Sequence, residues 1–419
     1  MAIARRCPLH LILLLAGPLY AQDPSFFLPD SATPLIPSGG HALFVDGSFA
    51  FASNALTNEL VLAMYNGEVL DRDLRNGVRD GLKGNNRMGV TIGLRATVLA
   101  NDSLFGRPWW QATYSLSHSE VGGARFTDDV YALTYFGNAD YEGRTAYLGP
   151  SALEQQRYQQ FAWGIMDLRS LSWARIALVK GQSFQHVDAR TADLYTAPDG
   201  RVLDALVAGT FARSDTAPDD LLSVNGLGLG ASARWNLALT PSWSKGRSWL
   251  SVGVEDLGMV RWNDRSLYLR KDTAYAYRGI AVENIFDLGL LVVDEPFIRD
   301  TLALDQAPKA QWRPLPFQVN VRFLARPWNR TALVLEAEQR YLPGFVPRIS
   351  LSALHSPSRT FRWGGGLHYG GFTDLTGSVR LEAAPGEHAY VHMELMNVLA
   401  PNASGKAFGI QAALGWRFR

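Results

Sequence analysis

The chain of 419 residues is rich in apolar and aromatic side chains and poor in charge. Hydrophobic residues make up 47%, charged residues make up 19%, and the formal net charge is +1. The charged share is below that of an ordinary soluble domain. These values exclude a disordered chain and a collagen-like chain, and they give no electrostatic reason to expect nucleic-acid binding.

The first 21 residues have the layout of a secretory signal peptide. Two arginines precede an apolar run over residues 9–15, and Ala21 supplies a small residue at the expected cleavage point. A short membrane anchor is the alternative, but the run is too short to span a bilayer comfortably. We therefore predict export and a mature chain over residues 22–419. That chain lacks Cys7, the only cysteine, and so has neither disulfides nor thiolate metal sites.

Alternation of apolar and polar residues dominates the remaining sequence, with the period of two that is typical of β-strands. In chain order the pattern is clearest over residues 90–98, 110–117, 317–323, 332–340, 378–383 and 390–396. Similar segments recur along the whole chain with turn residues between them, and tryptophans gather at their ends. Either a soluble β-sandwich or a membrane β-barrel alternates in this way.

Two of these features favour the barrel. The alternation extends over the whole chain, and aromatic rings with a polar group prefer the boundary between membrane and water. Outside the leader, no stretch of about 18 apolar residues could form a membrane helix. We predict an all-β outer-membrane barrel of about 14 antiparallel strands, within a range of about 12 to 16.

The last predicted strand has an apolar face, formed by Ala412, Leu414, Trp416 and Phe418. Outer-membrane barrels typically end in a strand with a terminal aromatic residue that the barrel-assembly machinery reads, and here the aromatic residue is penultimate. An open sheet edge in lipid would leave backbone groups without hydrogen bonds. We therefore expect this strand to close the barrel, with the assembly machinery and outer-membrane lipid as partners.

Three inserts between the strands look helical. Residues 68–82 place leucine and valine at fourfold spacing, and residues 127–136 begin with Thr127 and two aspartates, which suit a helix start. Residues 284–304 are mixed, and their centre fits a strand equally well. We expect the inserts either to plug the lumen or to lie on the periplasmic side, and simple closure of the barrel end is the plainest role.

The polar faces of the strands supply the candidate functional residues. A charge that faces lipid at the bilayer centre costs about 2–4 kcal/mol, so we assign these faces to the interior. The predicted pore-lining residues are Arg95, Gln318, Asn320, Arg322, Glu336, Glu338, Arg340, Arg380, Glu382, His392 and Glu394. Their charges nearly balance, which argues against a strongly ion-selective pore. His392 and Glu394 share a face and suit either a proton-sensitive spot or an ordinary polar contact.

No catalytic or metal-binding motif stands out. None of the eight histidines forms the compact pair of a helical metalloprotease. Residues 181–185 lack the second glycine of a nucleophile elbow, and residues 226–230 lack the spacing and the lysine of a phosphate loop. We predict no enzyme, no metal and no cofactor, with an outer-membrane hydrolase as the least favoured alternative.

Several short motifs occur in a recognisable order. They are Asn58-Glu59-Leu60, Tyr65-Asn66-Gly67, Asn86-Arg87-Met88-Gly89, Tyr135-Phe136-Gly137-Asn138 and residues 255–262. Together they resemble an uncharacterised family of outer-membrane β-barrels of the Bacteroidota, a domain of unknown function, over nearly the whole mature chain. The resemblance implies a barrel broadly similar to fatty-acid-transporter-like barrels and to type IX secretion-associated barrels, and it supplies no catalytic residues.

These observations predict a channel or uptake barrel for a small or amphipathic solute in the outer membrane. The alternative is a non-catalytic structural or assembly component of a surface or secretion machine, which would have an envelope protein as partner. The sequence does not name the solute or that partner.

Overall fold

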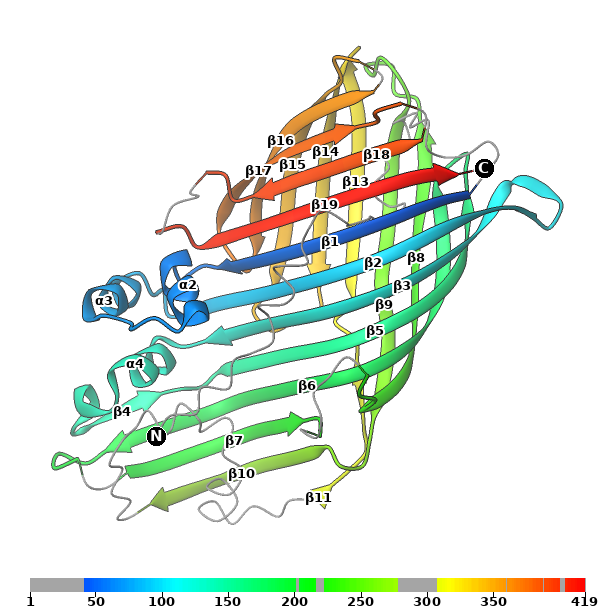
Figure 1. Cartoon of the computed structure of the whole chain (residues 1–419). Coiled ribbons are helices and arrows are strands. Elements are labelled where there is room, and N and C mark those ends of the chain that lie inside the picture. Colours follow the sequence, from blue (N-terminus) through cyan, green and yellow to red (C-terminus); the bar gives the residue numbers. More distant parts are fainter. Residues whose placement is uncertain are drawn as a thin grey trace.

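The computed structural model describes residues 41–200, 203–215, 222–277, 307–358, 360–386, 388–399 and 404–418. The predicted signal peptide and the predicted insert over residues 284–304 lie outside these ranges. Within them, the chain forms one antiparallel β-sheet that closes on itself (Figure 1).

Fourteen antiparallel strands form the closed wall, as the sequence predicts. They are β1 (His41–Ser53), β2 (Asn86–Leu104), β3 (Arg107–Phe126), β5 (Ser151–Asp167), β6 (Ser172–Thr196), β8 (Gly226–Leu239), β9 (Ser248–Trp262), β13 (Gln318–Trp328), β14 (Thr331–Arg340), β15 (Val346–His355), β16 (Phe361–Gly371), β17 (Leu375–Ala383), β18 (Ala389–Met396) and β19 (Ala407–Phe418). β19 pairs with β1 along its whole length, so no edge of the wall is left open there.

The two faces of the wall are inverted relative to a soluble protein. On β14, Leu335 is 49% exposed, whereas Glu338 is only 6% exposed. The same alternation holds over much of the other strands. The exceptions are apolar side chains inside the barrel, such as Trp249 and Leu324, and the Glu120–Arg157 ion pair on its outer face. The apolar faces therefore lie on the outside of the barrel, which is the orientation that the sequence predicts.

The two ends of the barrel differ. β1 begins and β19 ends at one end, where short turns such as Phe105-Gly106 join neighbouring strands. We call this the turn end. The opposite end, which we call the loop end, carries the longer connections and all the described helices (Figure 1). Five further strands complete the sheet, β4 (Arg144–Tyr147), β7 (Leu203–Arg213), β10 (Leu267–Tyr277), β11 (Ala307–Pro308) and β12 (Gln311–Pro314).

The wall extends furthest at the loop end along β6. The first part of this 25-residue strand pairs with β8, and its second part pairs with β7, which in turn pairs with β10. A bulge that leaves out Gln182 lies where the partner changes. Part of the sheet therefore rises above the closed barrel.

The helices differ from the prediction in number and in place. Instead of one helix over residues 68–82, there are two, α2 (Asn58–Asn66) and α3 (Arg72–Asp80). Gly67 ends α2 in the left-handed conformation with φ 69°, and the Asp71 carboxylate caps α3 by accepting from the Leu74 N–H at 2.8 Å. α4 (Asp128–Phe136) begins after Thr127, at the start of the second predicted helix. A 3₁₀ turn (Ala139–Tyr141) follows it.

The described helices lie at the loop end and pack on the rim (Figure 1), so the expectation that they plug the lumen is wrong for them. The other expectation, a place on the periplasmic side, depends on the membrane orientation proposed below. Their shared apolar cluster includes Phe51, Val90, Phe126 and Phe408, which belong to the outward faces of their strands. The helices thus pack against the outer rim, because that rim supplies the apolar surface they need. None of the described helices is long and apolar enough to cross a membrane.

Candidate functional site

The barrel contains a polar cavity of about 370 Å³ between its opposite walls. All the predicted pore-lining residues except Glu382 and His392 line it. Glu382 and His392 are buried beside it instead, with the Glu382 carboxylate 2.8 Å from Nε of Arg380. We call this cavity the chamber.

Ion pairs organise one side of the chamber. Glu338 on β14 accepts hydrogen bonds from Arg340 of the same strand and from Arg348 of β15. Arg322 on β13 donates two hydrogen bonds to one oxygen of Glu336, at 2.9 and 3.0 Å. Each carboxylate is therefore neutralised by a guanidinium on its own or a neighbouring strand. Arg348 was not among the predicted lining residues, although Arg348, Ser350 and Ser352 alternate with apolar residues in the sequence.

A second group of charges lies on the adjoining strands β8 and β9, since β9 pairs directly with β13. Arg234 donates to Glu255 at 3.1 Å, and Tyr158 and Gln160 of β5 donate to Asp256 at 3.2 and 3.0 Å. Asp256 has φ 57° and sits at a bulge where Glu255 and Asp256 together oppose one residue of β8. Both acids line the cavity for this reason. A strict period of two assigns them to opposite faces, so sequence reasoning did not find them.

The charges of the chamber balance. The described lining residues include six cations (Arg95, Arg234, Arg322, Arg340, Arg348 and Arg380) and six anions (Asp46, Glu255, Asp256, Glu336, Glu338 and Glu394). Neutral donors and acceptors lie among them, and His368 bridges the hydroxyls of Ser350 and Ser378 at 2.8 and 2.9 Å. The chamber is therefore rich in charged and hydrogen-bonding groups but carries no formal net charge when its histidines are neutral.

Two hairpin turns cross the barrel mouth above the chamber. Residues 341–345 join β14 to β15, and residues 372–374 join β16 to β17. Both reach the far wall at β2 and β3, where Leu342, Phe345 and Phe372 pack with Val121. We call these two turns the lid. The Arg340 guanidinium beside the lid also spans the lumen, donating to the Thr91 hydroxyl of β2 at 3.3 Å.

Glycines on the far wall make room for the lid. A Cβ on Gly89 would overlap the Phe372 ring, and a Cβ on Gly123 would lie 2.9 Å from that ring and 2.8 Å from the Pro343 carbonyl. Gly344 at the tip of the first turn has φ 80° and lies against the Ala124 carbonyl. Only glycine permits this close approach and this backbone conformation. The wall and the lid are therefore complementary in shape.

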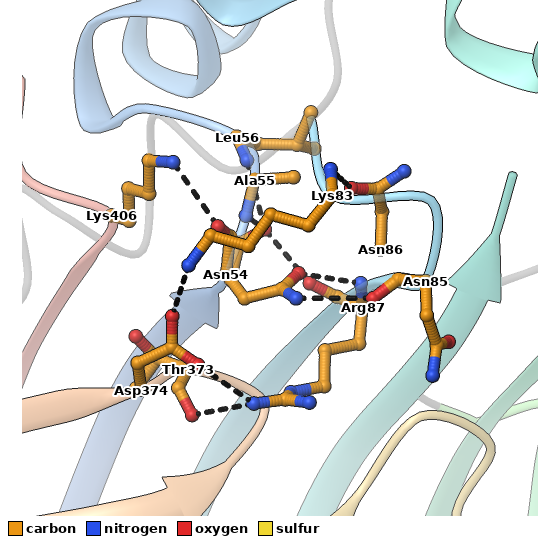
Figure 2. A network of polar contacts seen from close by, with 11 residues as sticks. Asn54, Ala55, Leu56, Lys83, Asn85, Asn86, Arg87, Thr373, Asp374 and Lys406 are labelled. Atoms are coloured by element: carbon orange, nitrogen blue, oxygen red, sulfur yellow. Dashed lines mark hydrogen bonds and ion pairs between the residues drawn. The ribbon is translucent and has the colours of Figure 1, made fainter. Parts of the chain in front are cut away.

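A polar network ties the lid to the loop that carries α2 and α3. Asp374 accepts from Lys83 Nζ at 2.5 Å and from Arg87 Nη2 at 3.1 Å (Figure 2). The Arg87 backbone N–H donates to Asn54 Oδ1 at 2.8 Å, and Lys406 Nζ donates to the Asn54 carbonyl at 3.1 Å. Burial lowers the pKa of Lys406, and the nearby Lys83 lowers it further. We call Asp374, Lys83 and Arg87 the latch.

Apolar residues line the interior near the turn end. One cluster contains Phe44, Leu99, Met166, Trp173 and Tyr390, which come from five different strands. A second cluster contains Trp249, Leu324, Val334 and Leu354 on β9, β13, β14 and β15. The polar chamber therefore lies between an apolar layer at the turn end and the lid at the loop end.

One arrangement in the upper wall resembles a nucleophile–histidine–acid set. Thr210 Oγ1 lies 3.4 Å from His186 Nε2, and His186 Nδ1 lies 2.6 Å from a Glu154 oxygen. That same oxygen accepts a hydrogen bond from Arg313 at 2.9 Å. Gln156 Nε2 donates hydrogen bonds to Glu154 Oε1 and to the Pro314 carbonyl. These bonds hold β12 to the wall, which is a structural role. In the described ranges, no group of three potential ligands is placed to hold a metal ion.

No protein-family model matches the chain, and no curated protein matches it in sequence. Membership of the Bacteroidota family therefore stays a prediction. The structural neighbours are outer-membrane barrels. They include the toluene transporter TbuX of Ralstonia pickettii (TM-score 0.42, 9% identity, 93% of this chain and 92% of that chain covered) and a FadL homologue of Pseudomonas aeruginosa (0.42, 10%, 96% and 95%).

The translocator domain of the autotransporter NalP from Neisseria meningitidis is also similar, with a TM-score of 0.35, 8% identity and 91% of this chain and 90% of that chain covered. These scores are low, and the neighbours differ in what their names describe. The likeness therefore assigns neither a family nor a solute to this chain.

Proposed function

We propose that the chain is an outer-membrane channel or uptake barrel for a small hydrophilic solute without net charge. The observation that carries this proposal is the inverted barrel with a charge-balanced polar chamber in its lumen. An apolar outer face suits lipid, and a polar interior suits a hydrated path. The predicted export signal fits this location.

The two ends suit opposite sides of that membrane. Bacterial outer-membrane barrels have short turns on the periplasmic side and longer loops outside the cell. On this basis the turn end faces the periplasm, and the lid, the latch and the helices face outward. The outward face of β19 remains the proposed signal for the assembly machinery.

The chamber also indicates the kind of solute. Its ion pairs form between neighbouring side chains of one wall, so the lumen offers little net field to attract an ion. Uncharged hydrogen-bonding side chains also line the chamber, among them Gln318, Asn320 and Ser350. A neutral or zwitterionic molecule with several donors and acceptors fits this lining better than an anion or a cation.

The lid makes the channel a gated one. Its two turns cross the mouth and pack on the opposite wall, so a solute that enters from outside must displace or pass them. We therefore expect low basal flux and a higher flux when the lid is loosened.

Swelling of proteoliposomes tests the proposal. Solutes of matched size and different charge are compared for the wild type and for Phe372→Ala, which removes the ring that seats the lid. We expect the variant to admit neutral and zwitterionic solutes faster than singly charged ones. No flux through either protein, or a clear preference for one sign of charge, would contradict the proposal.

A matched pair of substitutions on β13 tests the chamber itself. Asn320 points inward, and its neighbour Val321 is 42% exposed on the outer face. Asn320→Leu should slow the flux of the neutral solute, whereas Val321→Leu should leave it unchanged. Equal effects of the two substitutions would show that the flux does not depend on the side chains that line the chamber.

A second candidate function is a structural or assembly component of a surface machine. The extension of β6, β7 and β10 beyond the closed wall favours it, because a simple channel does not need that surface. A purified barrel that conducts no solute, but that keeps one defined envelope protein in constant ratio after mild extraction, would support this candidate over the channel.

A further inference from the structure

Helix α2 sits on the outer side of the barrel rim. Its buried residues Leu60 and Ala63 face the wall, and Leu60 belongs to a cluster with Phe51, Val90 and Phe408. In the register of the wall, Phe51 lies between Val90 of β2 and Phe408 of β19. Figure 1 shows α2 at the loop ends of these strands.

These wall residues continue the face of the barrel that points to lipid. Val90 shares a face of β2 with Leu94, which is 45% exposed. Phe408 shares a face of β19 with Ile410 and Trp416, which are 43% and 57% exposed. The surface that α2 covers is therefore the upper margin of the apolar outer band.

The other side of α2 is also apolar. Leu62, Met64 and Tyr65 are 46%, 51% and 51% exposed, and Val69 just beyond the helix is 93% exposed. At 100° per residue, Met64, Val61, Tyr65, the buried Asn58 and Leu62 follow one another around the helix, and Glu59 and Asn66 are the polar residues at the surface. Val61 packs on the cluster of Leu60, and Met64 Sδ accepts from the Tyr135 hydroxyl of α4 at 3.1 Å. A helix between protein and water has a polar outer face, so this pattern requires a second apolar environment.

Helix α3 shows the opposite character. Its exposed residues include Arg72, Asp73, Arg79 and Asp80. The pair thus has one apolar helix, which continues the apolar outer band, and one charged helix. Helices at a membrane surface divide their apolar and charged faces between lipid and water in the same way.

We propose that α2 lies in the outer leaflet of the membrane, with Leu62, Met64, Tyr65 and Val69 among the lipid acyl chains. Lipid is the occupant because the exposed arc is continuous with the lipid-facing band, and because α3 supplies the water-facing side. This inference rests on the proposed membrane location and not on the proposed solute or on transport.

Quenching of a site-specific fluorophore by lipid tests it. The host is the full chain with Cys7→Ser, so that an introduced cysteine is the only one. An environment-sensitive NBD label is attached at Leu62→Cys or, in a second variant, at Tyr65→Cys. Both positions are half exposed, so both substitutions should permit folding. The matched control is Asp73→Cys on the exposed side of α3.

The labelled proteins are reconstituted in phosphatidylcholine vesicles with or without bromine on the acyl chains. We expect brominated lipid to remove most of the emission at positions 62 and 65 and none at position 73. Water-like emission without quenching at both α2 positions would overturn the proposal. Because conductance is measured on the same samples, a failure of lipid contact is distinguishable from a failure of transport.

Discussion

Phe372 packs its ring onto Gly89 from the other side of the barrel mouth, so closely that a Cβ on that glycine would overlap the ring. Phe372 begins the turn between β16 and β17, whereas Gly89 lies on β2. Strands β18, β19 and β1 separate them along the wall. The contact therefore exists only because the barrel closes, and it fixes the lid across the lumen.

The first prediction concerns this contact. Gly89→Ala should displace the Phe372 ring and loosen the lid, because overpacking of this kind costs about 1–3 kcal/mol. Single-channel recording in planar bilayers should show a higher open probability. Gly122→Ala is the matched control, since its Cβ would lie 3.8 Å from the nearest atoms. The same open probability for both variants would show that the ring does not hold the lid.

The latch should contribute less than the ring. Asp374 and Lys83 are about half exposed, with side-chain exposures of 45% and 53%, and such pairs contribute about 0–1 kcal/mol. Asp374→Asn should therefore raise the open probability by less than Gly89→Ala, and the difference from wild type should shrink in concentrated salt. Asp264→Asn, on an exposed loop, is the control. A salt-independent effect at Asp374 would point to a different cause.

Ion selectivity should follow the charge balance of the chamber. Glu338→Gln changes the formal charge of the lining from zero to +1 and leaves Arg340 and Arg348 without their shared carboxylate. The reversal potential in a salt gradient should shift toward anion preference, and Arg348→Gln should shift it the other way. Removal of one partner of a buried ion pair in a dry interior costs about 3–5 kcal/mol of stability. We expect a smaller loss here, because polar groups line the chamber. Shifts of the reversal potential in the same direction in both variants would contradict the idea that the charge balance of the chamber sets its ion selectivity.

The last prediction compares two neighbours on β14. Leu335 is 49% exposed on the outer face, and Glu336 lines the chamber. Leu335→Arg should lower the free energy of unfolding of the barrel in lipid vesicles by about 2–4 kcal/mol, whereas Glu336→Gln should lower it less. Denaturant titration of both variants in vesicles measures the difference. An equal loss in both would contradict the assignment of the faces.

The inward and outward faces of the regular strands could be predicted from the sequence. Side chains alternate between the faces of a strand, so Glu336, Glu338 and Arg340 could be assigned to the interior from their spacing alone. The bulge at Asp256 breaks this spacing, so Glu255 and Asp256 could not be assigned in the same way. Helix α2 was missed because it is apolar nearly all round, and an amphipathic period was the signal for a helix.

By itself, the sequence determined the strand pattern, the closed all-β architecture and which face of each regular strand points outward. These properties depend on the direction of each side chain along one strand, which is local. Only the tertiary structure decided that the turn after β14 reaches β3, that Phe372 seats on Gly89 and that α2 packs on the outer rim. Each of these contacts joins residues far apart in the chain, and each forms only once β19 has paired with β1 and brought the opposite walls together.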